Sequence, residues 1–303
     1  MSDLPERVVL REVGPRDGLQ NESPVPTADK IRLIDELATT GVSEIEAVSY
    51  VHPRAIPQMA DAAEVWKGHR RDPEIRYSAL VPNLVGARRA VEAGFTDMEA
   101  VVSASHTHNQ RNVNRSPEES LEAITEVIEL AHANEVACQV IVATAFGCPY
   151  EGEIPEERVA SLAVRAVQAG ANSICFGDTT GMGSPPRVRR LLGRFRENCP
   201  DTQVALHLHD TRGTGMTNLI AGLEVGVDRF DASVGGLGGC PYAPGASGNI
   251  ATEEAVHLLH ELGVDTGIDL DRLLEVAEVA QQIVGRQLPS RVLKAGPRTR
   301  LAV

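Results

Sequence analysis

The sequence predicts an α/β protein in which eight parallel strands alternate with helices and close into a (β/α)8 barrel. Short β-branched runs alternate with amphipathic helical stretches at intervals of about 30 residues. The chain length of 303 residues suits one such barrel. Unusual polar residues also follow many of the β-branched runs, at the strand ends where barrel enzymes place their sites.

The β-branched runs supply the predicted strands. Because a helical stretch follows each run, successive strands must be parallel, and the crossover helices cover the outside of the sheet. The predicted strands are Val8–Val13, Glu44–Ser49, Arg76–Val81, Asp97–Ser103, Cys138–Ala145, Ser173–Asp178, Val204–Asp210 and Arg229–Val234.

Capping residues and prolines bound the predicted helices. Ser116 with Glu119 three residues later is a capping box, and Pro117 occupies the first helical position. The second unit has the weakest helix pattern, because Pro53 and Pro57 interrupt it before residues 59–66. The other predicted helices are Ala28–Thr39, Pro117–Ala133, Pro155–Gly170, Pro185–Asn198 and an extra C-terminal helix at about Leu270–Val284.

A doubly wound open sheet is the alternative fold, because it shows the same alternation. It is disfavoured because no G-x-G-x-x-G motif follows a predicted strand, and Gly181-Met182-Gly183 is too short to count. No low-complexity segment or Gly/Ser linker interrupts the chain. We therefore expect residues 1–303 to form a single catalytic barrel domain.

Composition excludes several classes of function. The net charge of −13 argues against a nucleic-acid partner, and aromatic residues, at 3%, leave few stacking platforms for bases. No apolar run reaches the ~18 residues of a membrane span, and the first residues resemble no signal peptide. The five cysteines form no C-x-x-C pair, which indicates reduced thiols in a cytoplasmic enzyme.

The seventh strand carries two histidines on one face. His207 and His209 are two residues apart, so on a strand both side chains point to the same side. The alternative reading is two core or ion-paired histidines, but this spacing near a strand end favours a pair of metal ligands.

Two adjacent charges follow the first strand. Arg16 and Asp17 precede Gly18, which suits a tight turn, and an ion pair within the loop is the alternative reading. Closure of the barrel would bring Asp17 to the histidines of the seventh strand. Asp17 would then supply a carboxylate ligand, and Arg16 would direct a guanidinium at a substrate oxygen.

The loop after the eighth strand, residues 235–249, holds six glycines in fifteen residues. Glycines permit positive φ and a close approach of the backbone to a ligand. A flexible linker is the alternative, but a linker does not normally contain a cysteine, a tyrosine and two prolines. The pattern favours a shaped active-site loop or lid, with Cys240 as a chemical group.

Two further carboxylates belong to the candidate site. Asp178 ends the sixth strand. Glu46 lies within the second strand, where a buried carboxylate needs a partner. A structural ion pair with an inward arginine and a catalytic role are both open for Glu46.

Together these motifs resemble the 3-hydroxy-3-methylglutaryl-CoA lyases, within the wider family of divalent-metal lyase, aldolase and Claisen-synthase TIM barrels. The resemblance covers about residues 7–286. The segments that carry it are Glu12-Val13-Gly14-Pro15-Arg16-Asp17-Gly18-Leu19-Gln20-Asn21-Glu22, Gly147-Cys148-Pro149-Tyr150-Glu151-Gly152, His207-Leu208-His209-Asp210-Thr211, Gly236-Leu237-Gly238-Gly239-Cys240-Pro241-Tyr242 and Gly245-Ala246-Ser247-Gly248-Asn249. Leu19 after R-D-G is similar to the lyases, whereas related synthases usually carry glutamate there.

The resemblance implies a metal centre and its ligands. The four ligands of Mg2+ or Mn2+ would be Asp17, His207, His209 and Asn249. Two nitrogens, a carboxylate and an amide oxygen suit a six-coordinate, fairly hard cation.

The resemblance also implies the reaction, a retro-Claisen cleavage of a 3-hydroxy-3-methylacyl-CoA to acetyl-CoA and acetoacetate. Arg16 and Cys240 would be catalytic, with Glu46 and Asp178 in the site. Arg16 would stabilise charge on the thioester oxygen, and Cys240 would protonate the enolate carbon. His207 and Asp178 are both open as the general base.

One position departs from the resemblance. His106 follows the fourth strand where the lyases usually carry an acid, which puts the acyl group of the substrate in question. An acyl-CoA substrate and a homo-oligomer, a dimer or larger, are expected by resemblance alone. A condensing synthase or aldolase on the same metal site, and a non-catalytic acyl-CoA-binding barrel, remain the alternative functions.

Overall fold

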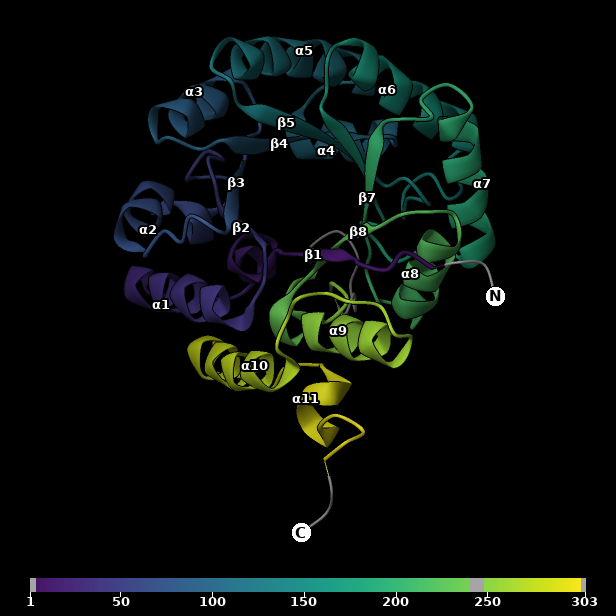
Figure 1. The fold of residues 1–303 in the computed structure, drawn as a ribbon. Coiled ribbons are helices and arrows are strands. Elements are labelled where there is room, and N and C mark those ends of the chain that lie inside the picture. The colour runs from purple at the N-terminus through teal and green to yellow at the C-terminus, as the bar shows by residue number, and fades with distance from the viewer. Residues whose placement is uncertain (1–3, 240–247, 301–303) are drawn as a thin grey trace.

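The computed structural model describes residues 4–239 and 248–300, which form a closed barrel of eight parallel strands (Figure 1). Each strand pairs with the next along the chain, and β8 pairs with β1. The predicted (β/α)8 fold is confirmed, and the open sheet is excluded. The strands are β1 Val9–Glu12, β2 Glu44–Ser49, β3 Arg76–Leu80, β4 Asp97–Ser103, β5 Ala137–Ala143, β6 Ser173–Gly177, β7 Gln203–His207 and β8 Arg229–Ala232.

Helices surround the barrel in the part of the chain that the structure describes (Figure 1). The α-helices are α1 Thr27–Leu37, α2 Ala62–Gly68, α3 Leu84–Glu92, α4 His106–Val113, α5 Pro117–Ala133, α6 Glu156–Gln168, α7 Pro185–Arg196, α8 Gly215–Glu224, α9 Thr252–Glu261, α10 Leu270–Val284 and α11 Arg291–Ala295. Shorter helical turns are η1 Gly14–Gly18, η2 Leu19–Asn21, η3 Ala38–Thr40, η4 Pro57–Met59 and η5 Val234–Gly236.

The capping box predicted for α5 is present. The Ser116 hydroxyl accepts from the Glu119 backbone N–H at 3.1 Å, and the Glu119 carboxylate accepts from the Ser116 N–H at 2.8 Å. Pro117 is the first helical residue. These contacts satisfy two backbone donors that the first turn of a helix leaves unpaired.

The structure departs from the sequence prediction in four places. β7 ends at His207, so His209 lies beyond the strand, in an isolated bridge with Asn249. η1 is a single π-helical turn rather than a tight turn, because the Val13 carbonyl accepts from the backbone N–H groups of Arg16, Asp17 and Gly18. α4 was not predicted, because its polar residues lack an apolar period; it begins where the Ser105 hydroxyl accepts from the His108 N–H at 3.1 Å. The short α11 was not predicted either.

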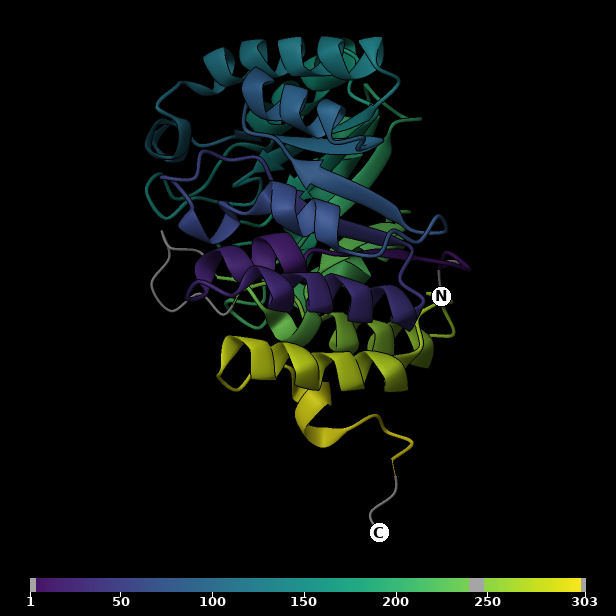
Figure 2. The ribbon, with the colours of Figure 1, turned by 90° about the vertical axis from the view of Figure 1, so that its left-hand side faces the viewer.

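The hydrophobic core lies mainly between the strands and the surrounding helices. A separate small apolar cluster of Ile141, Cys175 and Ala205 comes from neighbouring positions of β5, β6 and β7. Elsewhere several buried strand residues are charged, among them Arg11, Glu46 and Glu99. The helix predicted at 270–284 is α10, which lies beside α1 and α9 outside the ring of helices (Figures 1 and 2).

Candidate active site and metal centre

One buried carboxylate ties together the loops that follow β1 and β8. Glu12 Oε1 accepts from the backbone N–H groups of Gly14 at 2.7 Å and Val234 at 2.9 Å. Glu12 Oε2 accepts from the Thr252 hydroxyl at 2.6 Å. A Cβ at position 14 would lie 2.6 Å from Glu12 Oε1, so a larger residue would displace the carboxylate from these contacts. Glu12 therefore fixes the turn η1, which carries Arg16 and Asp17, to the segments that follow β8.

Asp17, His207 and His209 meet at the carboxyl-terminal end of the strands. One ligand atom from each lies within 4.8 Å of the other two. The Nε2 atoms of His207 and His209 are 3.1 Å apart, and His207 Nε2 lies 3.9 Å from Asp17 Oδ2. Two adjacent ligands on one octahedral cation are separated by about 3 Å. The three groups form a triad that could hold one metal ion, as the sequence predicts.

Asn249 adds a fourth donor to this triad. The backbones of His209 and Asn249 form an antiparallel bridge. The Asn249 amide N–H donates to Asp17 Oδ2 at 2.8 Å and to the Leu237 carbonyl at 3.1 Å, which fixes the orientation of the amide. Among the described residues, the buried Asn249 Oδ1 has no hydrogen-bond partner. A buried acceptor without a partner costs free energy. A cation at the triad would give it one, so the residues present fit a divalent metal.

The charges of the triad favour an ionised acid beside one protonated imidazole. Burial raises the pKa of Asp17, but the charges of Arg16 and both histidines lower it by more. The pKa therefore lies below its usual range. Burial lowers the pKa of His209 to about 3, helped by the charge of His207. Burial also lowers the pKa of His207, but its hydrogen bond to Asp231 and the nearby acids raise it overall. A divalent cation would take the place of the excess proton.

Arg16 is held between two acids. Its Nη1 donates to Asp17 Oδ1 at 2.9 Å, and its Nη2 pairs with Glu46 Oε2 at 2.5 Å. Arg16 Nε is buried and has no hydrogen-bond partner among the described residues. The structural ion pair considered for Glu46 is therefore present, and its partner is itself a candidate catalytic residue.

Asp178 lies just past the end of β6, next to the last residue of β7. Its backbone N–H donates to the His207 carbonyl at 2.8 Å. Its carboxylate accepts from the backbone N–H groups of Met182 at 2.8 Å and Gly183 at 3.0 Å. Burial raises the pKa of Asp178 to about 6, although these hydrogen bonds lower it. The group is therefore mostly ionised at neutral pH and can accept a proton.

The two remaining residues singled out from the sequence are Cys240 and His106. Cys240 lies outside the described residues. His106 is the exposed first residue of α4, and neither it nor His108 belongs to the metal triad. No interaction of His106 with the candidate site is seen among the described residues.

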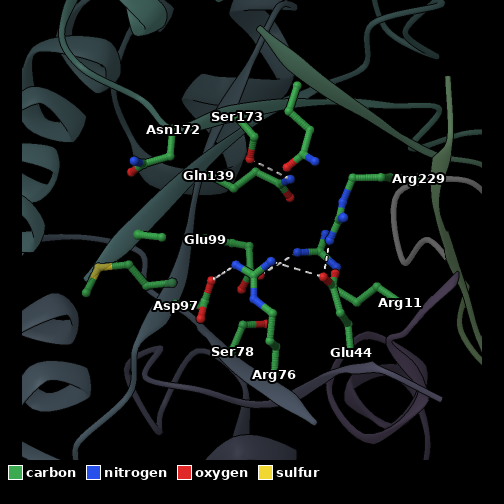
Figure 3. Close-up of a pocket in the computed structure, with 13 residues that line it drawn as sticks. Arg11, Glu44, Arg76, Ser78, Asp97, Glu99, Gln139, Asn172, Ser173 and Arg229 are labelled. Carbon is green, nitrogen blue, oxygen red and sulfur yellow. Dashed lines mark hydrogen bonds and ion pairs between the residues drawn. The ribbon is translucent and has the colours of Figure 1, made fainter. Parts of the chain in front are cut away.

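A pocket lies at the opposite, amino-terminal end of the strands (Figure 3). Its charged residues pair with one another: Arg76 with Glu44 and Asp97, and Arg229 with Glu44. The first residues of seven strands line it: Glu44, Arg76, Asp97, Ala137, Ser173, Gln203 and Arg229. Because none of the triad lines this pocket, it is not the candidate active site.

The sequence analysis missed Asp231, whose carboxylate contacts a triad member. Asp231 Oδ2 lies 3.0 Å from His207 Nδ1. The one signal in the sequence is the place of Asp231 within a predicted strand, where a buried carboxylate needs a partner, but other acids such as Glu46 share that signal.

Comparison with known proteins agrees with this geometry. The HMGL-like family pattern matches residues 7–280. The chain belongs to this family. Hydroxymethylglutaryl-CoA lyase of Bacillus subtilis (strain 168) is 43% identical over 291 residues, which covers 96% of this chain and 97% of that protein. A 3-hydroxy-3-isohexenylglutaryl-CoA/hydroxymethylglutaryl-CoA lyase of Pseudomonas aeruginosa is 42% identical and covers 97% of this chain and 98% of the relative.

A solved structure extends the comparison to the fold. The HMG-CoA lyase of Acinetobacter baumannii, in complex with coenzyme A and 3-methylmalate, has a TM-score of 0.94 to this HMGL-like chain at 45% identity. The match covers 100% of this chain and 99% of that one. Within the described residues, none of the helices is long and apolar enough to cross a membrane.

Proposed function

We propose that this HMGL-like protein is a metal-dependent carbon–carbon lyase that cleaves 3-hydroxy-3-methylglutaryl-CoA to acetyl-CoA and acetoacetate. The observation that carries the proposal is the convergence of Asp17, His207 and His209 from segments far apart along the chain. The protein in which they converge is 43% identical to a hydroxymethylglutaryl-CoA lyase.

The reaction requires two proton transfers around one bond cleavage. A base removes the proton of the C3 hydroxyl, and the C2–C3 bond breaks as C3 becomes a ketone. The bonding electron pair goes to C2 and spreads onto the thioester oxygen as an enolate. A proton delivered to C2 then completes acetyl-CoA. The protein must therefore supply a base, a group that stabilises negative charge, and an acid.

Asp17, His207, His209 and Asn249 would hold Mg2+ or Mn2+. Their two imidazole nitrogens, carboxylate and amide oxygen suit a fairly hard, six-coordinate cation with positions left for oxygen ligands. When bound, such a cation polarises the oxygens of the substrate and lowers the pKa of its hydroxyl.

Arg16 would stabilise the enolate. It is buried and positively charged, its Nε is unpaired among the described residues, and Glu46 on β2 holds its Nη2. A cation fixed in advance where negative charge develops stabilises the transition state without reorganising. Glu46 would act by keeping the guanidinium in place.

We favour Asp178 over His207 as the general base. Both ring nitrogens of His207 are engaged, Nδ1 with Asp231 and Nε2 within the metal triad. Asp178 is buried, and its pKa of about 6 leaves it ionised yet basic at neutral pH. Cys240, on the loop after β8, is proposed as the acid from the family resemblance.

The acyl group is assigned through the relatives. The Bacillus subtilis protein is a hydroxymethylglutaryl-CoA lyase, and the Pseudomonas aeruginosa protein is also named for a substrate with an isohexenyl group on C3. By the family resemblance, His106 stands where the lyases usually carry an acid, so the acyl group is assigned from the names that the relatives share, which is the methyl compound. We therefore propose the methyl substrate, with the isohexenyl substrate as the second one to assay.

Substrate class, compartment and assembly complete the proposal. Coenzyme A in the related Acinetobacter baumannii structure favours an acyl-CoA substrate here. Cys138, Cys148, Cys175 and Cys199 are buried free thiols, which favours the reducing cytoplasm. We also propose that the barrel acts as one catalytic domain and that the chain self-associates, which sedimentation would measure.

The decisive experiment measures acetyl-CoA release and bound metal together. We expect release from 3-hydroxy-3-methylglutaryl-CoA to stop in chelator and return with Mg2+ or Mn2+. Asp17→Ala and His209→Ala should lose both the metal and the activity, whereas the exposed control Asp271→Ala should keep both.

Three results would contradict the proposal in different ways. Full activity in chelator without bound metal would refute the metal dependence. Condensation of acetyl-CoA with a 2-keto acid, without cleavage, would favour a synthase. Tight binding of coenzyme A without turnover of either substrate would favour a non-catalytic barrel.

A further inference from the structure

Three residues from β1, β8 and β7 form one row across the barrel closure. Arg11 pairs in register with Asp231, and Asp231 pairs in register with His207. Residues paired in this way on neighbouring strands point to the same face of the sheet. The row therefore leads from β1 across the closure to one of the proposed metal ligands.

The side chains of this row are joined by direct contacts. Arg11 Nε and Nη2 donate to the two oxygens of Asp231, each at 2.9 Å. Asp231 Oδ2 is also 3.0 Å from His207 Nδ1. Arg11 and Asp231 are 7% and 2% exposed, so water does not compete for these bonds. A guanidinium that binds both oxygens fixes the plane of the carboxylate as well as its position.

The contact with Asp231 decides which nitrogen of His207 carries hydrogen. Both oxygens of Asp231 accept from the Arg11 guanidinium, which pairs with the ionised form of a carboxyl group. An ionised carboxylate can only accept hydrogen bonds, so His207 Nδ1 must be the donor. In the neutral ring the lone pair then lies on Nε2, the atom that faces His209 and Asp17.

Arg11 is itself held from the other side. Its Nη1 pairs with Glu99 of β4, a contact visible from the amino-terminal pocket (Figure 3). Arg11 thus neutralises two buried acids. Without this cation, Glu99 and Asp231 would both be buried acids that have lost their shared counter-charge, which is strongly unfavourable.

We propose that Asp231 and Arg11 are positioning residues of the metal centre: Asp231 sets the tautomer and ring orientation of His207, and Arg11 holds the Asp231 carboxylate in the plane that this requires. The inference rests on the proposed metal site but not on the identity of the substrate. Groups that orient a metal-bound histidine typically contribute 10–100-fold to metal affinity.

The test measures binding of Mn2+ alone to the metal-free full chain, through the electron paramagnetic resonance signal of free Mn2+. Asp231→Asn should weaken binding about 10–100-fold. The asparagine cannot offer two acceptor oxygens: its NH2 group must face either Arg11 or His207. Facing His207, it would favour the tautomer that carries hydrogen on Nε2.

Two further variants separate positioning from general disruption. Arg11→Lys keeps the charge but cannot bind both oxygens of Asp231, so its Mn2+ affinity should fall between those of the wild type and Asp231→Asn. Asp97→Asn removes an acid of the amino-terminal pocket that pairs with Arg76 rather than with Arg11 or Asp231, and its affinity should equal that of the wild type. Circular dichroism and thermal midpoints identify any variant that does not fold.

A spectroscopic readout tests the tautomer directly. Long-range 1H–15N correlations of the His207 ring, recorded in the metal-free protein at a pH high enough to neutralise the ring, should show hydrogen on Nδ1 in the wild type, and on Nε2 in part of the Asp231→Asn population. If Asp231→Asn does not fold, Arg11→Lys decides.

The outcomes are distinguishable. Wild-type protein that binds no Mn2+ would overturn the metal site and this inference together. Wild-type binding with unchanged affinity in folded Asp231→Asn, or in Arg11→Lys where Asp231→Asn fails to fold, would overturn the inference alone.

Discussion

Asp178 shows how one buried carboxyl can be tuned for proton transfer. Its pKa of about 6 results from burial, opposed by two backbone N–H donors. As pH falls through about 6 the group gains a proton and can no longer act as a base. We therefore expect kcat/KM of the wild type to fall below this pH.

Asp178→Asn should lower kcat by about 10²–10⁴ and remove this acid limb from the pH profile. Asp201→Asn, at an exposed position before β7, is the matched control and should leave the profile unchanged. An acid limb that persists in Asp178→Asn would assign the base to another residue.

The pairing of Arg16 with Glu46 makes a second prediction at this scale. Arg16→Gln should lower kcat by about 10²–10³, the typical effect of losing one donor at a developing negative charge. Because Glu46 contacts Arg16 directly, the effect on kcat of a substitution at Glu46 should depend on whether Arg16 is present.

Steady-state kinetics of Arg16→Gln, Glu46→Gln and the double variant test this dependence. The double variant should be about as slow as Arg16→Gln alone. Effects that multiply independently would show that Glu46 does not act through Arg16.

The sequence allowed prediction of the residues that bring chemistry, but not of those that hold them. His207, His209, Asp17 and Arg16 are recognisable because their residue types and positions indicate ligands and charge. Asp231 could not be distinguished from any other strand acid, because its role depends on the register that pairs it with both Arg11 and His207. Register is set by closure of the barrel and leaves no local pattern.

At the scale of a single element, the capping box of α5 makes a stability prediction. Ser116→Ala removes the acceptor for the Glu119 N–H and should lower the free energy of unfolding by about 1 kcal/mol. Urea unfolding would measure it. Ser116→Asp, which retains a capping oxygen, should stay close to the wild type, and equal losses in both variants would contradict the capping explanation.

A buried acid in the first turn of α9 makes stability depend on pH. Burial raises the pKa of Glu253 from 4.5 to about 8, so the folded chain keeps a proton that the unfolded chain releases. Its Oε1 accepts from the Gly235 N–H at 2.7 Å and links α9 to η5. The folded state thus loses stability from this group as pH rises from about 5 to 8.

Glu253→Gln cannot lose a proton. It should therefore be more stable than the wild type at pH 8, and the two should converge near pH 5. Thermal midpoints across this range would show it, with Glu278→Gln on the exposed face of α10 as the control. A constant difference between Glu253→Gln and the wild type would contradict the role of the proton.

Elements with a strong hydrophobic period could be predicted, and elements built from polar contacts could not. The predicted strands overlap β1–β8, and α10 has the predicted bounds. The turn η1 depends on one carbonyl, that of Val13, which accepts from three N–H groups, and α4 depends on the Ser105 cap. Such contacts are specific to the folded geometry.

Metal binding should raise the thermal stability of the whole folded chain. A cation that binds only the folded chain stabilises it by about 2.7 kcal/mol at 100 times its dissociation constant. Differential scanning calorimetry should therefore show a rise in Tm of the wild type with Mn2+ and no rise for Asp17→Ala. A rise in both proteins would place the stabilising cation elsewhere.

The contact between β1 and β8 has a consequence for synthesis of the chain. β1 is synthesised before the other strands, yet Arg11 and Glu12 each have a partner on β8 or after it. A nascent chain without its last quarter cannot assemble the metal centre, however well its other strands have formed. Capture of a divalent ion would therefore report closure of the barrel, when β1 pairs with β8.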